Sequence, residues 1–96
     1  MNAYQITFVV DTEKEERCKE LLTDLENTLK KKHARFKSEI WGEKPLPFSI
    51  QGKEKGIYCH ISFNVDEALG NFISNLSKWC RKHEEILKCE IQKLGD

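Results

Sequence analysis

Residues 57–64, Ile-Tyr-Cys-His-Ile-Ser-Phe-Asn, carry the clearest structural signal in this sequence. Apolar and more polar side chains alternate along them, and this period of two is typical of a strand with one buried face. The expected buried side chains are Ile57, Cys59, Ile61 and Phe63, and the expected open-face side chains are Tyr58, His60 and Ser62. We therefore predict a half-buried strand over this stretch.

Three other stretches show the same alternation. Near the N-terminus the buried set is Tyr4, Ile6, Phe8 and Val10, and the open set is Gln5, Thr7 and Val9. Residues 35–41 begin a second strand that keeps its alternation to residue 50, across Pro45 and Pro47. Because proline removes a ladder donor, this strand is expected at a sheet edge, with residues 51–56 as the turn that follows it. Residues 86–94 form the last strand, with Leu87, Cys89 and Ile91 facing inward.

Two amphipathic helices separate these strands. Thr12 with Glu15 is a capping box, so the first helix is expected to begin there and to end near His33. Its apolar stripe is Cys18, Leu21, Leu22, Leu25 and Leu29. Asp66 is the expected N-cap of the second helix. The stripe of that helix is Leu69, Phe72, Ile73, Leu76 and Cys80, with Trp79 on its flank.

The order strand-helix-strand-strand-helix-strand predicts an α+β fold of the ferredoxin-like, split-βαβ type. In this arrangement (βαββαβ) two helices cover one face of a four-stranded antiparallel sheet. The 96 residues suit a single domain over 1–96. No apolar run reaches the roughly 18 residues of a membrane helix, and no secretory signal is visible at the N-terminus.

Charge and cysteine content narrow the functional classes. Sixteen basic and sixteen acidic residues cancel, yet residues 1–29 sum to −4 and residues 30–96 to +4, so a basic surface can still form. The four cysteines, Cys18, Cys59, Cys80 and Cys89, include no C-x-x-C pair. We expect four buried, unbonded thiols in a reducing cytosol in preference to a zinc site or a disulfide.

The sequence shows no catalytic or cofactor-binding constellation. An acylphosphatase-like enzyme needs a backbone cradle and an arginine after the first strand, but residues 10–13 are acidic and lack glycine. A metal carrier of this fold would hold paired cysteines in the same loop. The histidines (His33, His60 and His83) are expected at two helix ends and on the open sheet face, away from any nucleophile. Neither an enzyme, a cofactor, a metal nor a small-molecule substrate is expected.

Basic side chains gather in the loops and at the helix ends. They are Lys30, Lys31, Lys32, Arg35 and Lys37 after the first helix, Lys44, Lys53 and Lys55 in the hairpin, Lys78, Arg81 and Lys82 in the second helix, and Lys88 and Lys93 in the last strand. If these groups converge they can bind phosphates, whereas at the helix ends they can equally complement the helix dipole. Base stacking on the open sheet face has little support, because only the third strand offers aromatic rings there.

Several segments together resemble the bacterial and organellar small-subunit ribosomal protein six family over nearly the whole chain. Residues 4–10 resemble its first strand, residues 56–58 the start of its third and residues 86–91 its last. Trp41-Gly42, followed by Lys44, Leu46, Phe48 and Ile50, is similar to its signature hairpin. Where the family usually has a further basic or polar residue, a small residue and a tyrosine, this chain has Pro45, Pro47 and Phe48, and it lacks the acidic tail of some members.

The resemblance implies a cytoplasmic structural protein of the small ribosomal subunit, which binds small-subunit ribosomal RNA as a heterodimer with ribosomal protein eighteen. On this basis the RNA-binding candidates are Tyr4, Lys53, Lys55, Arg81, Lys88 and Lys93. The candidate protein-partner surface is Trp41, Lys44, Leu46 and Phe48, although Trp41 and Phe48 could instead pack over the helices. The alternative hypothesis is a dimeric ferredoxin-like regulatory domain that senses a small molecule, against which the acidic first loop counts.

Overall fold

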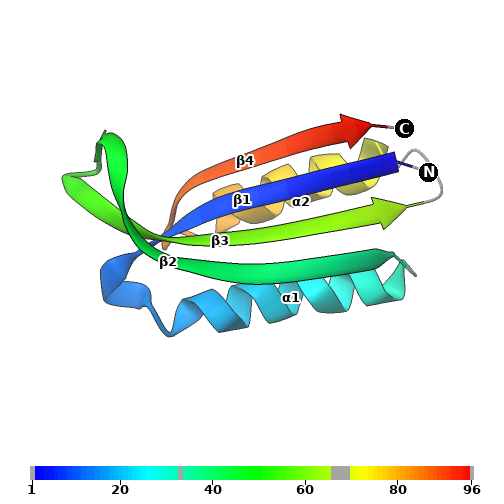
Figure 1. The fold of residues 1–96 in the computed structure, drawn as a ribbon, viewed down its shortest axis with the longest axis horizontal. Coiled ribbons are helices and arrows are strands. Elements are labelled where there is room, and N and C mark those ends of the chain that lie inside the picture. Colours follow the sequence, from blue (N-terminus) through cyan, green and yellow to red (C-terminus); the bar gives the residue numbers. More distant parts are fainter. Residues whose placement is uncertain (1, 33, 66–69, 96) are drawn as a thin grey trace.

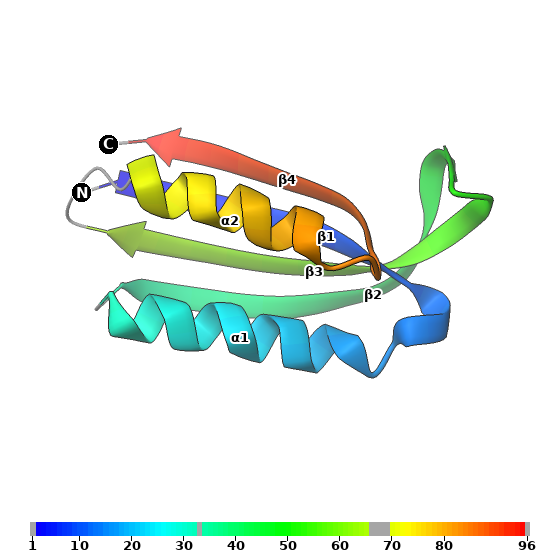
Figure 2. The ribbon, with the colours of Figure 1, turned by 180° about the vertical axis from the view of Figure 1, so that it is seen from behind.

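Four strands and two helices follow one another in the predicted order (Figure 1). The computed structural model describes residues 2–32, 34–65 and 70–95. Its elements are β1 (Asn2–Asp11), a short 3-10 helix η1 (Thr12–Lys14), α1 (Arg17–Lys31), β2 (Arg35–Ile50), β3 (Lys53–Val65), α2 (Gly70–Lys82) and β4 (Ile86–Gly95). The strands form one antiparallel sheet in the order β2-β3-β1-β4. Both helices lie on one face of it (Figure 2), so the predicted ferredoxin-like fold and the edge position of β2 are confirmed.

The main core lies between the sheet and the helices. In the centre of the sheet Phe8 is paired with Cys59 and Ile6 with Ile61, and all four are buried on the helix-covered side. The five apolar residues predicted for the α1 stripe are all buried, as are Leu76 and Cys80 of α2. The structure does not describe some of the predicted positions, which are His33, Asp66, Leu69 and the side chains of Phe72 and Ile73. For the described residues, the period-of-two and helical patterns place the core correctly except at Val9 and Leu87.

The first helix begins later than the capping box predicts. Asp11, and not Thr12, acts as the cap, since its carboxylate accepts a hydrogen bond from the backbone N–H of Glu13 at 3.0 Å. This Asx turn leads into η1, and α1 starts only at Arg17. The delay has a tertiary cause, because β1 stays paired with Gly56 and donates to the Glu85 carbonyl as far as Asp11.

The β2–β3 hairpin differs from the prediction in its turn and in its shape. The turn is two residues long, with Gln51 and Gly52 at φ 52° and 78°, the positive values that a type I′ turn requires. The far half of the hairpin bends across the open face of the sheet (Figure 1). There Gly56 and Leu46 cover Val9, which is only 2% exposed. The prediction that Val9 faces solvent is therefore wrong.

The start of β4 contains a bulge that the sequence pattern did not reveal. Val10 pairs with Ile86 but its neighbour Val9 pairs with Lys88, so the register skips Leu87. Ile86 is consequently the buried residue opposite Val10. Leu87 is only partly buried and lies outside the core cluster. The inward assignment of Leu87 is corrected, whereas Cys89 and Ile91 do pack against the core.

The cysteines divide into two pairs. Cys18 and Cys59 are free and buried, as expected, and burial raises the pKa of both thiols. Cys80 and Cys89 instead form a disulfide between α2 and β4, with their Cα atoms 6.4 Å apart. Because this pairing depends on how the last turns of α2 pack against β4, nine residues of separation gave no sign of it. The prediction of four unbonded thiols is wrong for this pair.

Candidate nucleic-acid and protein interface

Trp41 reaches the open face of the sheet because of a bulge in β2. The register passes from Ile40, opposite Cys59, to Gly42, opposite Tyr58, and so leaves Trp41 without a paired residue. Gly42 supports this distortion with φ 95°, a conformation that costs glycine little. The indole stacks on the imidazole of His60, with ring centroids 4.7 Å apart and planes 14° apart. Its edge is fixed too, since Nε1 donates to Glu39 Oε2 at 2.9 Å.

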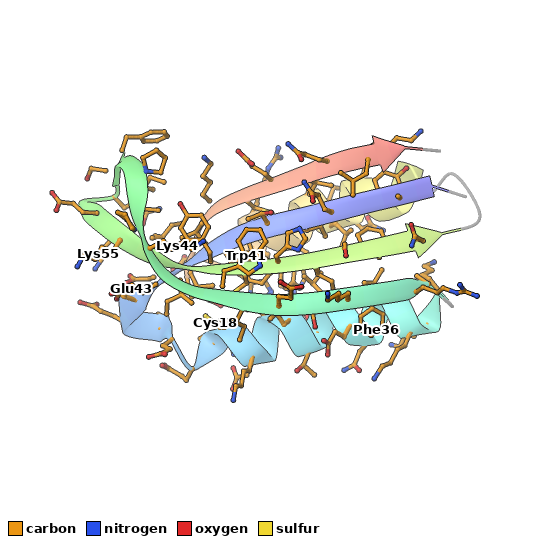
Figure 3. All side chains as sticks on the ribbon, viewed as in Figure 1. Cys18, Phe36, Trp41, Glu43, Lys44 and Lys55 are labelled. Carbon is orange, nitrogen blue, oxygen red and sulfur yellow. A yellow bond between two sulfur atoms is a disulfide. The ribbon has the colours of Figure 1, made fainter. Side chains whose placement is uncertain are left out.

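Lys44 places a positive charge over this aromatic group. Its Nζ lies 5.3 Å from the centroid of a Trp41 ring and 5.9 Å from that of Tyr58, distances typical of cation–π contacts. Figure 3 shows Trp41 and Lys44 projecting from the same part of β2. Trp41 remains 42% exposed. The open face therefore presents a held but accessible indole ring beside a cation.

The charge of Glu39 belongs to the same surface. The hydrogen bond from Trp41 and a second from Lys37 hold the pKa of the Glu39 carboxyl below its usual range. Lys37 Nζ lies 3.3 Å from this carboxylate. Glu39 is therefore ionised at neutral pH and orients the indole, while Lys37 offsets its charge.

Amide side chains extend the aromatic pair toward the opposite edge of the sheet. His60 Nε2 lies 3.1 Å from Gln5 Oε1, and Gln5 in turn donates to Gln92. Trp41, His60, Gln5 and Gln92 come from β2, β3, β1 and β4 respectively, so one row of contacting side chains crosses the whole sheet. We call this set the transverse row.

The far half of the hairpin separates two residues that the sequence grouped together. Leu46 is buried at 9% exposure beneath the bend, so it holds the hairpin together and is not part of an open surface. Phe48 is 63% exposed, and Nζ of Lys88 lies 5.7 Å from its ring centroid. Lys88 also contacts Glu90 at 3.5 Å. An exposed aromatic ring of β2 thus meets a cation of β4.

A hollow between α2 and β4 is lined by a second predicted cation together with Lys88. Its volume is about 410 Å³, and its lining includes Arg81, Lys88 and Leu87. The disulfide between Cys80 and Cys89 forms part of its wall. Arg81 and Lys88 therefore line one depression, and Lys88 is also the residue that contacts Phe48.

The structure does not bring the other RNA-binding candidates into this group. Tyr4 is a core residue, 9% exposed and stacked on Phe63 with centroids 5.6 Å apart. Lys53 lies 3.6 Å from carboxylate oxygens of both Asp11 and Glu13, so η1 neutralises it. Lys55 is exposed on the hairpin (Figure 3). Lys93 is exposed but pairs with Tyr4, which places it on the helix side of β4.

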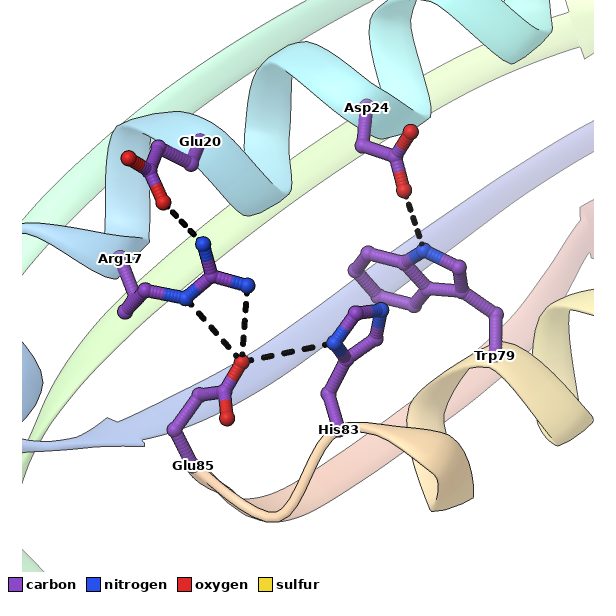
Figure 4. A network of polar contacts seen from close by, with 6 residues as sticks. All are labelled: Arg17, Glu20, Asp24, Trp79, His83 and Glu85. Atoms are coloured by element: carbon purple, nitrogen blue, oxygen red, sulfur yellow. Dashed lines mark hydrogen bonds and ion pairs between the residues drawn. The ribbon is translucent and has the colours of Figure 1, made fainter.

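The helix side carries a polar network that ties the helices and the β4 loop together (Figure 4). Arg17 donates from Nε and one terminal nitrogen to Glu85 at 3.3 and 3.2 Å, and His83 Nδ1 lies 3.4 Å from the same oxygen. The backbone N–H of Glu85, together with Arg17, keeps the pKa of this carboxyl below its usual range. Trp79 donates to Asp24 across the helices at 2.7 Å. These contacts satisfy one another and act structurally.

Sequence reasoning placed Gln5 and His60 on the open face but gave neither a role, and it passed over Gln92. The alternation of the strands could have shown that Gln5 and His60 share a face. Nothing in the sequence revealed the bulge that brings Trp41 to His60. Among the described residues no group of three or more His, Cys, Asp or Glu gathers as metal ligands would. In the same residues no helix is long and apolar enough to span a membrane.

The fold and its open face define a ferredoxin-like α+β domain with aromatic rings, amides and cations on the uncovered side of the sheet. Residues 3–93 match the family model described as Ribosomal protein S6. The small ribosomal subunit protein bS6 of Corynebacterium kroppenstedtii is 34% identical over 93 residues, covering 95% of both chains. That of Bifidobacterium longum is 26% identical over 94 residues, covering 96% of this chain and 94% of the relative. The chain belongs to the ribosomal protein S6 family.

The solved structures agree on the fold. The crystal structure of 30S ribosomal protein S6 from Thermotoga maritima superposes with a TM-score of 0.81 at 20% identity, covering 96% of this chain and 86% of that one. The S6 family consists of structural proteins without enzymatic activity, which confirms the expectation that this chain is not an enzyme. It also favours the ribosomal hypothesis over the small-molecule sensor.

Proposed function

We propose that this chain is a cytoplasmic structural component of the small ribosomal subunit, where it binds small-subunit ribosomal RNA together with ribosomal protein eighteen. Family membership supports the location, and the surface supports the mode of binding. The observation that carries the proposal is the convergence of Phe48, Lys88 and Arg81. Lys88 of β4 contacts the ring of Phe48 of β2, and it lines one depression together with Arg81 of α2.

The RNA contacts in this proposal are electrostatic. Lys88 and Arg81 line one depression and Lys55 is exposed on the hairpin, so these three side chains are the proposed phosphate contacts. Tyr4 is left out because its ring is buried, and Lys53 because η1 already neutralises it. Lys93 does not line this depression and is not part of this group.

The protein contact in this proposal is the hairpin. Phe48 is a large apolar ring at 63% exposure beside a cation, a combination common at the centre of protein interfaces. Leu46 contributes indirectly, by holding the bend that presents Phe48. Trp41 and Lys44 belong with the transverse row and are not part of this contact.

Sedimentation of cell extracts through a sucrose gradient tests the location. The tagged chain should travel with small subunits, and its recovery only at the top of the gradient would refute the proposal. For RNA binding, the double variant Arg81→Ala/Lys88→Ala should lower the salt slope of affinity for small-subunit RNA by about two. The matched control is Lys30→Ala, an exposed lysine on α1, which should leave the slope unchanged.

Phe48→Ala tests the protein contact. It should weaken association with ribosomal protein eighteen by roughly 5-fold or more, as expected when a central aromatic ring is removed from an interface. Leu94→Ala is the control, because Leu94 is also exposed (55%) but lies at the far end of β4. Equal effects of the two variants in a pull-down titration would count against the hairpin as the contact surface.

A further inference from the structure

We propose that Trp41, His60 and Lys44 form a stacking site for an unpaired RNA nucleotide on the open face of the sheet. The base would lie on the indole of Trp41, and Lys44 would contact the phosphate. This inference rests on the proposed function in one respect, that the ligand is RNA. It adds a site that reads an unpaired base, which phosphate contacts alone do not provide.

The indole is held in place before any ligand arrives. His60 stacks against it at 4.7 Å, Glu39 accepts its N–H at 2.9 Å, and the bulge at Gly42 fixes its direction. Such a ring costs little conformational entropy to use, because its rotamer is already restricted. Aromatic platforms of this kind bind unpaired bases through their π faces. The ring is 42% exposed, so the platform is open to solvent.

Lys44 supplies the charge that a nucleotide needs. Its ammonium group lies toward Tyr58, 5.9 Å from that ring, two residues along β3 from His60. Lys44 therefore contacts both Trp41 and Tyr58, whereas His60 stacks on the indole. A lysine chain is flexible, so a base can take the place of the ammonium group over the ring while that group moves to the adjoining phosphate. Both components of a nucleotide then have a partner.

The polar groups next to the indole suit base edges. Gln5 and Gln92 continue the transverse row across β1 and β4, and each amide can both donate and accept a hydrogen bond. The distance from Trp41 across four strands spaced about 4.8 Å apart accommodates more than one nucleotide. Unpaired RNA segments are the targets that proteins read through such edges.

A protein partner fits this part of the surface less well. The open face outside the hairpin bend carries Gln5, Thr7, His60, Ser62, Glu90 and Gln92. The fully buried centre of a protein interface is depleted in charged groups and rich in apolar ones. None of these six side chains is apolar. Aromatic rings, amides and a lysine together favour a nucleotide.

Fluorescence titration of the full chain tests the site. Trp41 and Trp79 are its two tryptophans, so in the variant Trp79→Phe excitation at the red edge of the absorption band reports on Trp41 alone. The probe is a single-stranded hexamer of riboadenosine, and the matched probe is a ribose-phosphate hexamer that lacks the bases. Stacking predicts quenching of Trp41 by the first probe and little quenching by the second.

Substitutions in the Trp79→Phe background and in the unmodified chain separate the components. Trp41→Leu, whose binding is followed by the fluorescence anisotropy of end-labelled hexamers because it lacks the reporter indole, should weaken binding of the adenosine hexamer by roughly 5- to 150-fold. It should leave the base-free hexamer unaffected, and Trp41→Phe should restore much of the loss. Lys44→Met should lower the salt slope by about 0.7 for both probes, the amount expected for one phosphate contact on a single strand. Circular dichroism and urea midpoints confirm that each variant is folded.

Equal losses for both hexamers, or no loss with Trp41→Leu, would overturn the stacking site. A loss of ribosomal protein eighteen binding with unchanged hexamer binding would instead assign Trp41 to the protein partner, and would also overturn it. The proposed function fails separately. If the chain stays off small subunits in the gradient while the hexamer still quenches Trp41, the ribosomal role is refuted and the stacking site remains.

Discussion

Gly56 is the position where a single β-carbon should have the largest effect on this fold. The residue lies in β3 beneath the bend of the hairpin, and a Cβ there would overlap Cγ1 of Val9. It would also come to 3.4 Å from the Val10 carbonyl oxygen and 3.6 Å from Leu46 Cδ2. Val9 is 2% exposed and cannot rotate into solvent. Gly56→Ala is therefore expected to destabilise the protein.

Two opposing effects set the magnitude. Replacing glycine by alanine restricts the unfolded chain and stabilises by about 0.4–1 kcal/mol where the backbone allows it. Overpacking a closed site costs about 1–3 kcal/mol, occasionally more. Because the overlap involves a branched side chain fixed by its neighbours, we expect the steric cost to prevail, with a net loss of about 2 kcal/mol. For a chain of this size that corresponds to a fall in Tm of about 8–16 °C.

A double-mutant cycle with Val9→Ala identifies the cause. Val9→Ala alone removes two buried carbons and should cost about 1–3 kcal/mol, but it also removes the atom that overlaps. Adding Gly56→Ala to Val9→Ala should then cost almost nothing, which gives a coupling of about 2 kcal/mol in urea denaturation. Gly52→Ala serves as the control, because no atom lies within 4 Å of its Cβ position and no coupling to Val9 is expected. Additive effects of Gly56→Ala and Val9→Ala would refute the packing argument.

Three further predictions concern ionisable groups. The folded-state pKa of Glu85 is depressed, so its contribution to stability is present above its unfolded pKa near 4.3 and is lost as the pH falls through the folded value. Between pH 6 and pH 3, the urea midpoint of Glu85→Gln should therefore fall less steeply than that of the unmodified chain. Identical slopes for the two proteins would contradict this. Cys18 and Cys59 are buried with raised pKa values, so iodoacetamide at pH 8 should label neither thiol until the chain unfolds, as judged by mass spectrometry. Because Lys53 is paired with carboxylates whereas Lys55 is exposed, Lys55→Ala should reduce the salt slope of RNA binding by about one and Lys53→Ala by clearly less, and equal reductions would show that both lysines contact phosphate.

The sequence alone determined the order of the elements and most of the core. Period-of-two alternation identified the buried face of β1 and β3, and a single helical stripe identified all five buried residues of α1. The prolines of β2 indicated an edge strand, since a missing N–H is tolerated only where no neighbour needs it. These predictions succeed because each depends on side-chain direction within one element, which local backbone geometry fixes.

The tertiary structure alone decided the site. Whether Trp41 meets His60, whether Leu46 is covered, and whether Phe48 reaches Lys88 all depend on one bulge and on the bend of the hairpin. The packing of α2 against β4 brings Cys80 and Cys89 within reach of a disulfide. The same packing makes Arg81 and Lys88 line one hollow. Contacts between elements that are distant in the chain arise from register and packing in three dimensions. A pattern read along one strand or one helix carries no information about them.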